Sequence, residues 1–202
     1  ASDVYKRQET GRLEMVRGEG ELRSIFSATA EGNLNGVYYT YEVHTPDGTF
    51  SSHDPYARAC GVNGHRSMVI DLSKTDPDGF ADEDRPKLAD PMSMVITEVS
   101  IADVSADASA HSRYPGKFKA FTEDKILSYF KDMGVTHLQL MPSYDFASID
   151  ESDSLKEQYN WGYDPYNYNV PEGSYSTDPF NGAVRVREYK DCLLYTSPSP
   201  RD

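Results

Sequence analysis

The feature that most restricts the fold is a strand–helix–strand pattern in the second half of the sequence. Residues 94–101 form a largely apolar run, and residues 135–141 form another that stops at Pro142. Between them, the apolar residues of 126–133 lie on one stripe of an amphipathic helix. Two strands joined through a helix are predicted to be parallel with a right-handed crossover, the repeating unit of α/β barrels and doubly wound sheets.

The predicted helix has recognisable ends. Thr122 is expected to cap its N-terminus, because a threonine hydroxyl accepts a hydrogen bond from a free N–H of the first turn. Glu123 and Asp124 place negative charge at the positive end of the helix dipole. Gly134 is expected to end the helix in a left-handed conformation.

Long connections follow both predicted strands. Residues 102–121 follow the first strand, and residues 142–180 follow the second. Parallel α/β folds carry their sites at the C-terminal ends of strands, and loops of this length are usually functional or disordered. We therefore expect a site within 142–180.

The N-terminal part of the chain has a different pattern. Residues 9–75 contain short segments rich in β-branched and aromatic residues, with a Pro-Asp-Gly turn at 46–48. This pattern predicts an all-β sandwich module. Residues 76–90 are acidic and contain two prolines, so we expect a linker there. The predicted strands are 21–27, 36–45, 49–52 and 67–72.

Charge and composition exclude several classes of partner. The net charge of -13 repels phosphate backbones and anionic lipids, so we expect no nucleic acid and no membrane surface as partner. The two cysteines, Cys60 and Cys192, are too few for a disulfide framework or a cysteine-rich zinc site. The five histidines lack metal-ligand spacing, and we expect no metal or cofactor. Such a cysteine content fits a cytoplasmic and a secreted protein equally well.

An aromatic motif lies within the second long connection. Residues 159–168 read Tyr-Asn-Trp-Gly-Tyr-Asp-Pro-Tyr-Asn-Tyr. Flat rings beside short polar side chains suit a sugar, whose C–H face stacks while its hydroxyls form hydrogen bonds. A tyrosine-rich loop that packs on itself has the same composition, so composition alone leaves both interpretations open.

The order of these residues resembles a known family. Tyr-Asn-Trp-Gly-Tyr-Asp-Pro at 159–165 resembles the signature of type I pullulanases, which are debranching enzymes of the α-amylase superfamily. Residues 134–142 and 144–146 resemble the second barrel strand of that family and the segment after it. Residues 36–43 and 54–64 resemble the β-sandwich module that precedes the barrel. The resemblance covers most of the chain.

The resemblance implies a fold and a function. The fold is an all-β sandwich, similar to a carbohydrate-binding module, followed over 91–191 by the first β/α units of a (β/α)8 TIM barrel. The parent protein would cleave α-1,6-glucosidic branch linkages in pullulan, glycogen or limit dextrin, with an α-glucan as its partner. The family's catalytic carboxylates lie on later strands, so we expect no catalytic residue in these 202 residues. Another debranching or branching enzyme of the superfamily, or a non-catalytic α-glucan-binding module, remains an alternative.

The resemblance also implies which residues bind substrate. Tyr163 would stack under the sugar at the cleavage point, and Asp164 beside it would bind a hydroxyl. Asn160 and Trp161 are further substrate-binding candidates. A tryptophan in such a loop is also often a packing anchor, and this alternative applies to Trp161.

Some segments depart from the family pattern. The first barrel strand usually carries an aromatic residue and a histidine, then an arginine, where this chain has Thr97, Ser100 and Ala102. Residues 1–8 and 192–202 resemble translated sequencing-adaptor sequence, so we expect both ends to be non-native. A helix that begins near residue 182 should then end after about two turns. The acidic run 150–153 is expected to be a solvated loop face.

Overall fold

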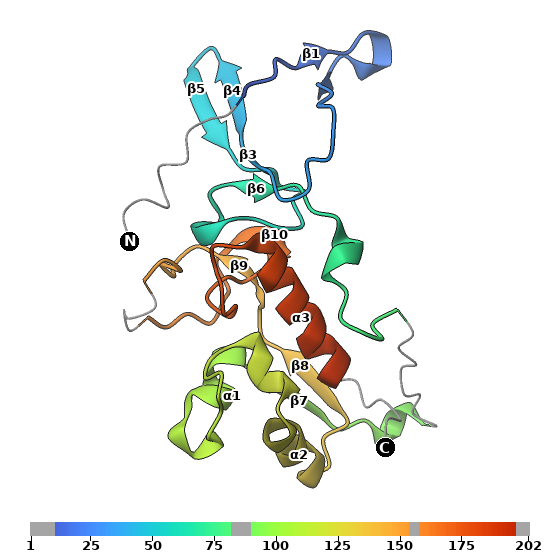
Figure 1. Cartoon of the computed structure of the whole chain (residues 1–202), viewed down its shortest axis with the longest axis vertical. Helices are drawn as coiled ribbons and strands as arrows, with labels where there is room; N and C mark the ends of the chain where they lie inside the picture. The colour runs from blue at the N-terminus through green and yellow to red at the C-terminus, as the bar shows by residue number, and fades with distance from the viewer. Residues whose placement is uncertain (1–10, 82–89, 154–157, 197–202) are drawn as a thin grey trace. The chain divides into compact units, whose positions relative to one another are not determined.

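A computed structural model of the chain describes residues 11–81, 90–153 and 158–196 (Figure 1). The chain divides into a small unit that ends at Leu34 and a larger unit that begins at Asn35. In the small unit, β1 (Val16–Arg17) pairs antiparallel with β2 (Phe26–Ser27) around a 3-10 turn at Gly20–Leu22. The side chains of both strands are exposed, so this unit has little apolar burial.

The first strands of the larger unit form two short antiparallel ladders. β3 (Tyr38–Tyr39) pairs with β6 (Ser67–Met68), and β4 (Tyr41–Thr45) pairs with β5 (Gly48–Ser52). Pro46 and Asp47 form the predicted hairpin turn, and Gly48 after them has a φ of 143°. Each of these ladders has two strands, and β4 and β5 are exposed along almost their whole length. The described residues therefore do not form the two packed sheets of the predicted sandwich.

The predicted parallel strand pair is confirmed. β7 (Ile96–Val99) and β8 (His137–Leu140) are parallel, in register from Ile96 opposite His137 to Val99 opposite Leu140. The helix α2 (Asp124–Asp132) precedes β8 and buries Ile126 and Phe130 of the apolar stripe expected from the sequence, whereas Met133 at the end of that stripe is 50% exposed. Two strands are too few to close a barrel, and the described residues contain no closed barrel.

The ends of α2 agree only partly with the prediction. Gly134 has a φ of 73° and its N–H donates to Lys131 O, which confirms the left-handed end. The N-cap position is held by Glu123 rather than by Thr122. The Thr122 hydroxyl instead donates to Lys119 O, within the 3-10 helix η7 (Phe118–Thr122) that precedes α2. A 3-10 turn directly before a helix thus displaced the cap by one residue.

The two long connections contain secondary structure. The first holds α1 (Ile101–Ala106) and the 3-10 helices η6 (Ala108–Ala110) and η7. At the position that departs from the family pattern, the Ser100 hydroxyl caps α1 by accepting from Asp103 N. The second connection holds β9 (Tyr144–Phe146) and β10 (Pro165–Pro171), which pair antiparallel with register shifts.

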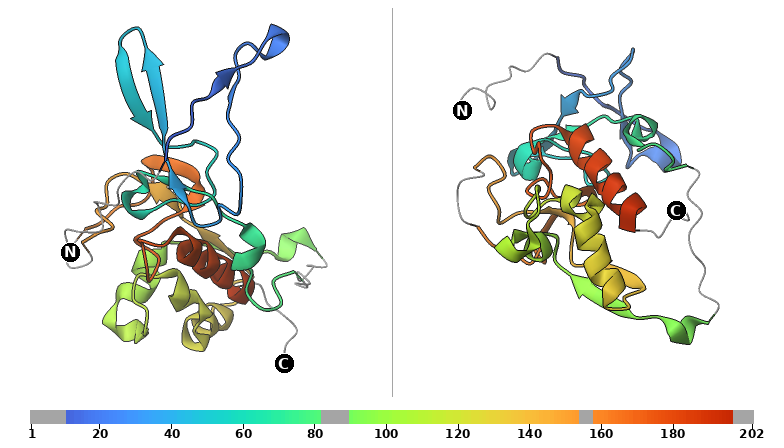
Figure 2. Two further views of the ribbon diagram at one scale, coloured as in Figure 1. Left: turned by 45° about the horizontal axis from the view of Figure 1, so that its top comes forward. Right: turned by 60° about the horizontal axis from the view of Figure 1, so that its bottom comes forward.

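The main core lies between these elements and α3 (Gly182–Thr196), which packs on η7 (Figure 2). Its buried members come mainly from β7, α1, η7, α2, β9 and α3, and they include Phe118, Phe121 and Phe130. Cys192 is fully buried in this core, and α3 continues to Thr196. The expected non-native tail at 192–202 therefore starts inside a packed helix. Residues 1–8 and 197–202 lie outside the described residues.

The compact unit extends across the predicted domain boundary. Ala57 and Cys60 pack against Val170, and Ala59 and Met68 pack against Val186. Residues on both sides of the linker predicted at 76–90 thus belong to one unit, and the division lies at Leu34 instead. Within the parts of the chain that the structure describes, no helix is long and apolar enough to cross a membrane.

Candidate functional site

Residues 160–164 form a turn that is closed by side-chain hydrogen bonds. Asn160 Nδ2 donates to Asp164 Oδ1 over 2.7 Å, and Asn160 Oδ1 accepts from Gly162 N over 2.7 Å. On the other side, Asp164 Oδ2 accepts from the Ser148 hydroxyl. The two polar residues of the motif thus brace the turn from within, and Ser148 ties it to the segment after β9.

Glycine is the only residue type that fits at position 162, the centre of this turn. Its φ is +87°, and a Cβ added there would lie 2.8 Å from Pro142 O and 3.2 Å from Phe146 Cδ1. The Ala147 N–H donates to Asp164 O over 3.1 Å. The turn therefore rests directly on the end of β8 and on β9, where only a residue without a side chain leaves room.

The turn presents two aromatic side chains to solvent. Trp161 is 61% exposed and Tyr163 is 63% exposed. Tyr144 and Tyr168 lie beside this turn, with their ring centroids 5.2 Å apart. Burial, together with the nearby Tyr168, Tyr163 and Asp164, raises the pKa of Tyr144. Within the described residues, the Trp161 ring is thus largely free of packing contacts.

Asp164 is an ionised acceptor within this group. Burial acts to raise its pKa, but the hydrogen bonds from Ser148 and Asn160 outweigh burial and hold the pKa below its usual value. The carboxylate is therefore charged at neutral pH. Asp164 directly follows Tyr163 in the sequence, and the ring of Tyr163 is exposed.

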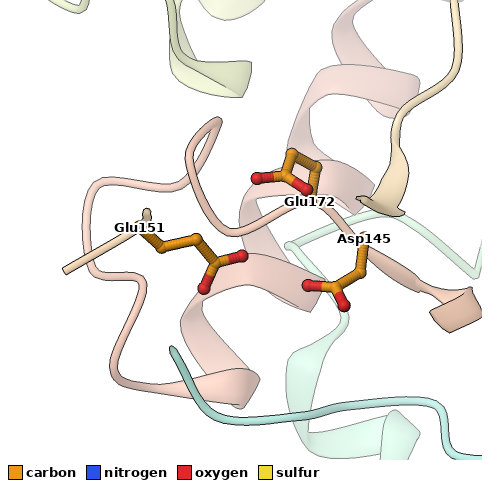
Figure 3. A group of neighbouring side chains, drawn as sticks. All are labelled: Asp145, Glu151 and Glu172. Carbon is orange, nitrogen blue, oxygen red and sulfur yellow. The ribbon is translucent and has the colours of Figure 1, made fainter. Parts of the chain in front are cut away.

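A second polar group lies beneath the turn. Figure 3 shows the carboxyl groups of Asp145, Glu151 and Glu172 gathered around a common space beside α3, with oxygens within 4.8 Å of one another. Arg185 Nη1 lies 3.0 Å from Asp145 Oδ1, and Arg185 Nη2 lies 2.9 Å from Glu151 Oε2. The guanidinium supplies the positive charge of this buried group.

Backbone donors complete the buried group. Glu172 Oε2 accepts from Phe146 N over 2.9 Å, and Glu172 Oε1 accepts from Ser174 N over 2.8 Å. Glu151 Oε1 accepts from Gly173 N over 3.0 Å. Because Phe146 also packs beneath Gly162, the buried group holds β9 in the position that supports the turn.

Burial changes the protonation of two of these acids. Burial, followed by repulsion from Glu151 and Asp145, raises the pKa of Glu172 to about 8. Burial also raises the pKa of Glu151 to about 7, although Arg185 acts to lower it. The expectation that 150–153 is a solvated face is therefore wrong for Glu151, which is 5% exposed. The backbone N–H groups that donate to the Glu151 carboxylate, and the Arg185 guanidinium, belong to residues distant in sequence. The local run of acids therefore gave no sign that Glu151 is buried.

The structure brings the four predicted residues, Asn160, Trp161, Tyr163 and Asp164, into one turn. Sequence reasoning missed Ser148 as its partner, and a serine in a loop carries no signal of such a role. It also missed Tyr144 and Tyr168 as neighbours. Exposed rings and short polar side chains thus lie together on a braced turn near the C-terminal end of a parallel strand, in a chain of mixed α/β class.

Comparison with known proteins agrees with this class. The chain is 31% identical to the pullulanase of Bacillus subtilis over 92% of its own length and 26% of that relative. It matches the crystal structure of Paenibacillus barengoltzii pullulanase in complex with maltohexaose and alpha-cyclodextrin, with 38% identity and a TM-score of 0.89, over 95% of this chain and 31% of that one. The pullulanase from Bacillus acidopullulyticus matches with 39% identity and a TM-score of 0.83, over 94% and 24% of the two chains. No protein-family model matches the chain.

These likenesses extend over nearly the whole chain in both sequence and fold. The chain is therefore similar to pullulanases in both respects. It spans about a quarter of the length of the Bacillus subtilis relative.

Proposed function

We propose that this chain supplies a glucose-binding turn of an enzyme that hydrolyses α-1,6-glucosidic branch linkages in pullulan, glycogen or limit dextrin. The observation that carries the proposal is the braced turn at 160–164, which exposes Trp161 and Tyr163 beside a charged Asp164. The similarity to pullulanases supports it, and so does the maltohexaose in one matching structure.

Each residue of the turn has a distinct role in this proposal. Tyr163 offers its ring face to the C–H face of a glucosyl unit, and Asp164 accepts a hydrogen bond from a sugar hydroxyl. Trp161 gives a second ring for a neighbouring unit. Asn160 acts as a positioning residue, because its amide holds Asp164 and Gly162 in place.

The proposal places the catalytic carboxylates outside these 202 residues. Retaining hydrolysis needs two carboxyl groups about 5 to 5.5 Å apart that both reach the scissile bond. Asp145, Glu151 and Glu172 are close together, but all three are buried and Arg185 pairs with two of them. Substrate cannot reach this group, so it does not supply the catalytic pair.

A binding measurement tests the proposed glucan site. Trp161 is the only tryptophan of the chain, so its fluorescence reports directly on the turn. We expect maltotriose to change this fluorescence in a saturable way, and Tyr163→Ala to weaken binding. Tyr56→Ala is the matched control, because Tyr56 is 82% exposed and lies outside the turn. A folded chain that shows no response to maltotriose would contradict the proposal.

The enzymatic part of the proposal needs a separate measurement. The gene is extended downstream, and the longer protein is assayed for release of reducing ends from pullulan. An aspartate and a glutamate on later strands together with pullulan hydrolysis would support the enzyme. Glucan binding without hydrolysis in the extended protein would instead favour a non-catalytic glucan-binding module.

A further inference from the structure

A cleft lies next to the aromatic turn, on the other side of Ser148. It has a volume of about 360 Å³ and is bounded by the segment after β9, by residues preceding β6, and by Gln158 and Tyr166. A volume of this order is enough for a small ligand. Its lining residues are Asn63, His65, Ala147, Ser148, Ile149, Asp150, Gln158 and Tyr166.

Reciprocal hydrogen bonds hold the walls of the cleft. The Asn63 N–H donates to Glu151 Oε2 over 2.6 Å, and the Glu151 N–H donates to Asn63 Oδ1 over 2.7 Å. On the facing side, Gln158 Oε1 accepts from Asp150 N over 2.7 Å while Gln158 Nε2 donates to Asp150 O over 3.0 Å. Asn63 also has a φ of 58°, a left-handed conformation that these bonds maintain. The cleft is therefore preformed.

The side chains of the cleft suit a neutral polyol. The rings of Tyr166 and His65 both line the cleft, with centroids 6.1 Å apart and planes at 87°, and His53 packs on Tyr166 at 4.5 Å with its plane tilted by 53°. Each lining ring thus offers its own aromatic surface to a ligand. The Ser148 hydroxyl donates to Asp164 and Gln158 Oε1 accepts from Asp150 N, so each of these two oxygens keeps one lone pair with which to accept from a ligand hydroxyl. The Asp150 carboxylate and the net charge of -13 disfavour an anion. This combination of a ring face with short polar groups is the same one that the turn at 160–164 presents.

Ser148 connects the cleft to the turn. Its hydroxyl lines the cleft and donates to Asp164 Oδ2. A ligand in the cleft would thus lie next to the carboxylate that flanks Tyr163. We infer that the cleft is a second subsite, which binds another glucosyl unit of the same α-glucan. This inference rests on the proposed function of the turn.

The test compares a short and a long ligand. Maltose and maltohexaose are titrated against the full 202-residue chain, with Trp161 fluorescence as the readout of the turn. If the cleft holds a second unit, maltohexaose binds more tightly than maltose. His65→Ala and Tyr166→Ala should each remove roughly 5-fold or more of the maltohexaose affinity and leave maltose binding unchanged. His65 is exposed, so its removal keeps the inference testable if the Tyr166 variant does not fold.

Three controls separate this inference from the proposed function. Tyr163→Ala should weaken both ligands, and Tyr56→Ala should weaken neither. The imidazole proton resonances of His53 and His65 should shift with maltohexaose and stay unchanged with maltose. Equal affinity for the two ligands, or unaltered maltohexaose binding in both cleft variants, overturns the second subsite while the turn still binds. Absence of any Trp161 response overturns the proposed function and the second subsite together.

Discussion

Arg185 Nη1 lies 3.0 Å from Asp145 Oδ1, and both side chains are withdrawn from solvent. Asp145 lies on β9 between Tyr144 and Phe146, and Phe146 packs beneath Gly162. This ion pair therefore fastens α3 to the strand that supports the aromatic turn. The turn that carries the exposed rings of Trp161 and Tyr163 is therefore supported by a strand that a buried ion pair holds to α3.

Loss of the arginine should unfold or strongly destabilise the chain. Arg185→Met leaves two buried carboxylates without their counter-charge, and breaking a buried pair in this way costs about 3 to 5 kcal/mol. The free energy of unfolding is measured by urea denaturation. Arg187→Met on the same helix is the control, because Arg187 is exposed and its loss should change stability by no more than about 0.5 kcal/mol. Equal stability of the two variants would show that the buried charge contributes nothing.

Gly162 should tolerate no side chain. Gly162→Ala adds a strained positive φ and a contact of 2.8 Å with Pro142 O, so we expect a loss of more than about 1 kcal/mol. Gly134→Ala is a matched control, since its φ is +73° but nothing lies within 4 Å of the added Cβ. Both variants place a side chain at a positive φ, so the difference between their urea midpoints isolates the destabilisation caused by the steric contact at position 162. The Trp161 emission should change only in Gly162→Ala, and a larger loss in Gly134→Ala would contradict this account.

The buried acids predict how stability depends on pH. The pKa of Glu172 is raised from 4.5 to about 8 in the folded chain, so between these values the folded state binds more protons than the unfolded state. Stability is therefore greatest below the unfolded pKa and declines as the pH rises toward 8. One extra bound proton gives a slope of at most about 1.4 kcal/mol per pH unit.

Urea denaturation at several pH values between 5 and 8 measures this decline, which ends near the raised pKa of Glu172. Glu172→Gln is uncharged at every pH and should flatten the curve over this range. In that variant, stability should still decline slightly with pH, because Glu151 has a pKa raised to about 7. Stability that rises with pH across this interval would show that Glu172 is ionised in the folded chain.

Tyr163 should matter through its ring face rather than its hydroxyl. In an extended, catalytically complete protein, Tyr163→Phe keeps the face and should be mild. Tyr163→Ala should lose about 1 to 3 kcal/mol of stacking, which corresponds to roughly 5- to 150-fold. The larger loss is expected in kcat on pullulan, because a distorted ring near the transition state depends more on the platform. Near-wild-type kcat/KM in a folded Ala variant, with folding checked by circular dichroism, rules out the stacking role.

Local patterns in the chain were sufficient for the parallel strand pair, the helix between its strands, and the left-handed end at Gly134. Each of these depends on residues that are near one another in sequence, since periodicity and capping act within a few residues. The motif at 159–165 likewise predicted the position of the turn. Its internal bonds join residues at most four positions apart, such as Asn160 and Asp164.

Long-range packing set the remaining features. Glu151 is buried because it meets Arg185, 34 residues later in the chain, and Asn63, 88 residues earlier. Residues on both sides of the predicted linker belong to one compact unit, in which Ala59 and Met68 pack against Val186, and Cys192 of α3 is buried in the main core. Burial of a charge or a short apolar side chain depends on which distant segment covers it, and composition and spacing along the chain carry no information about that segment.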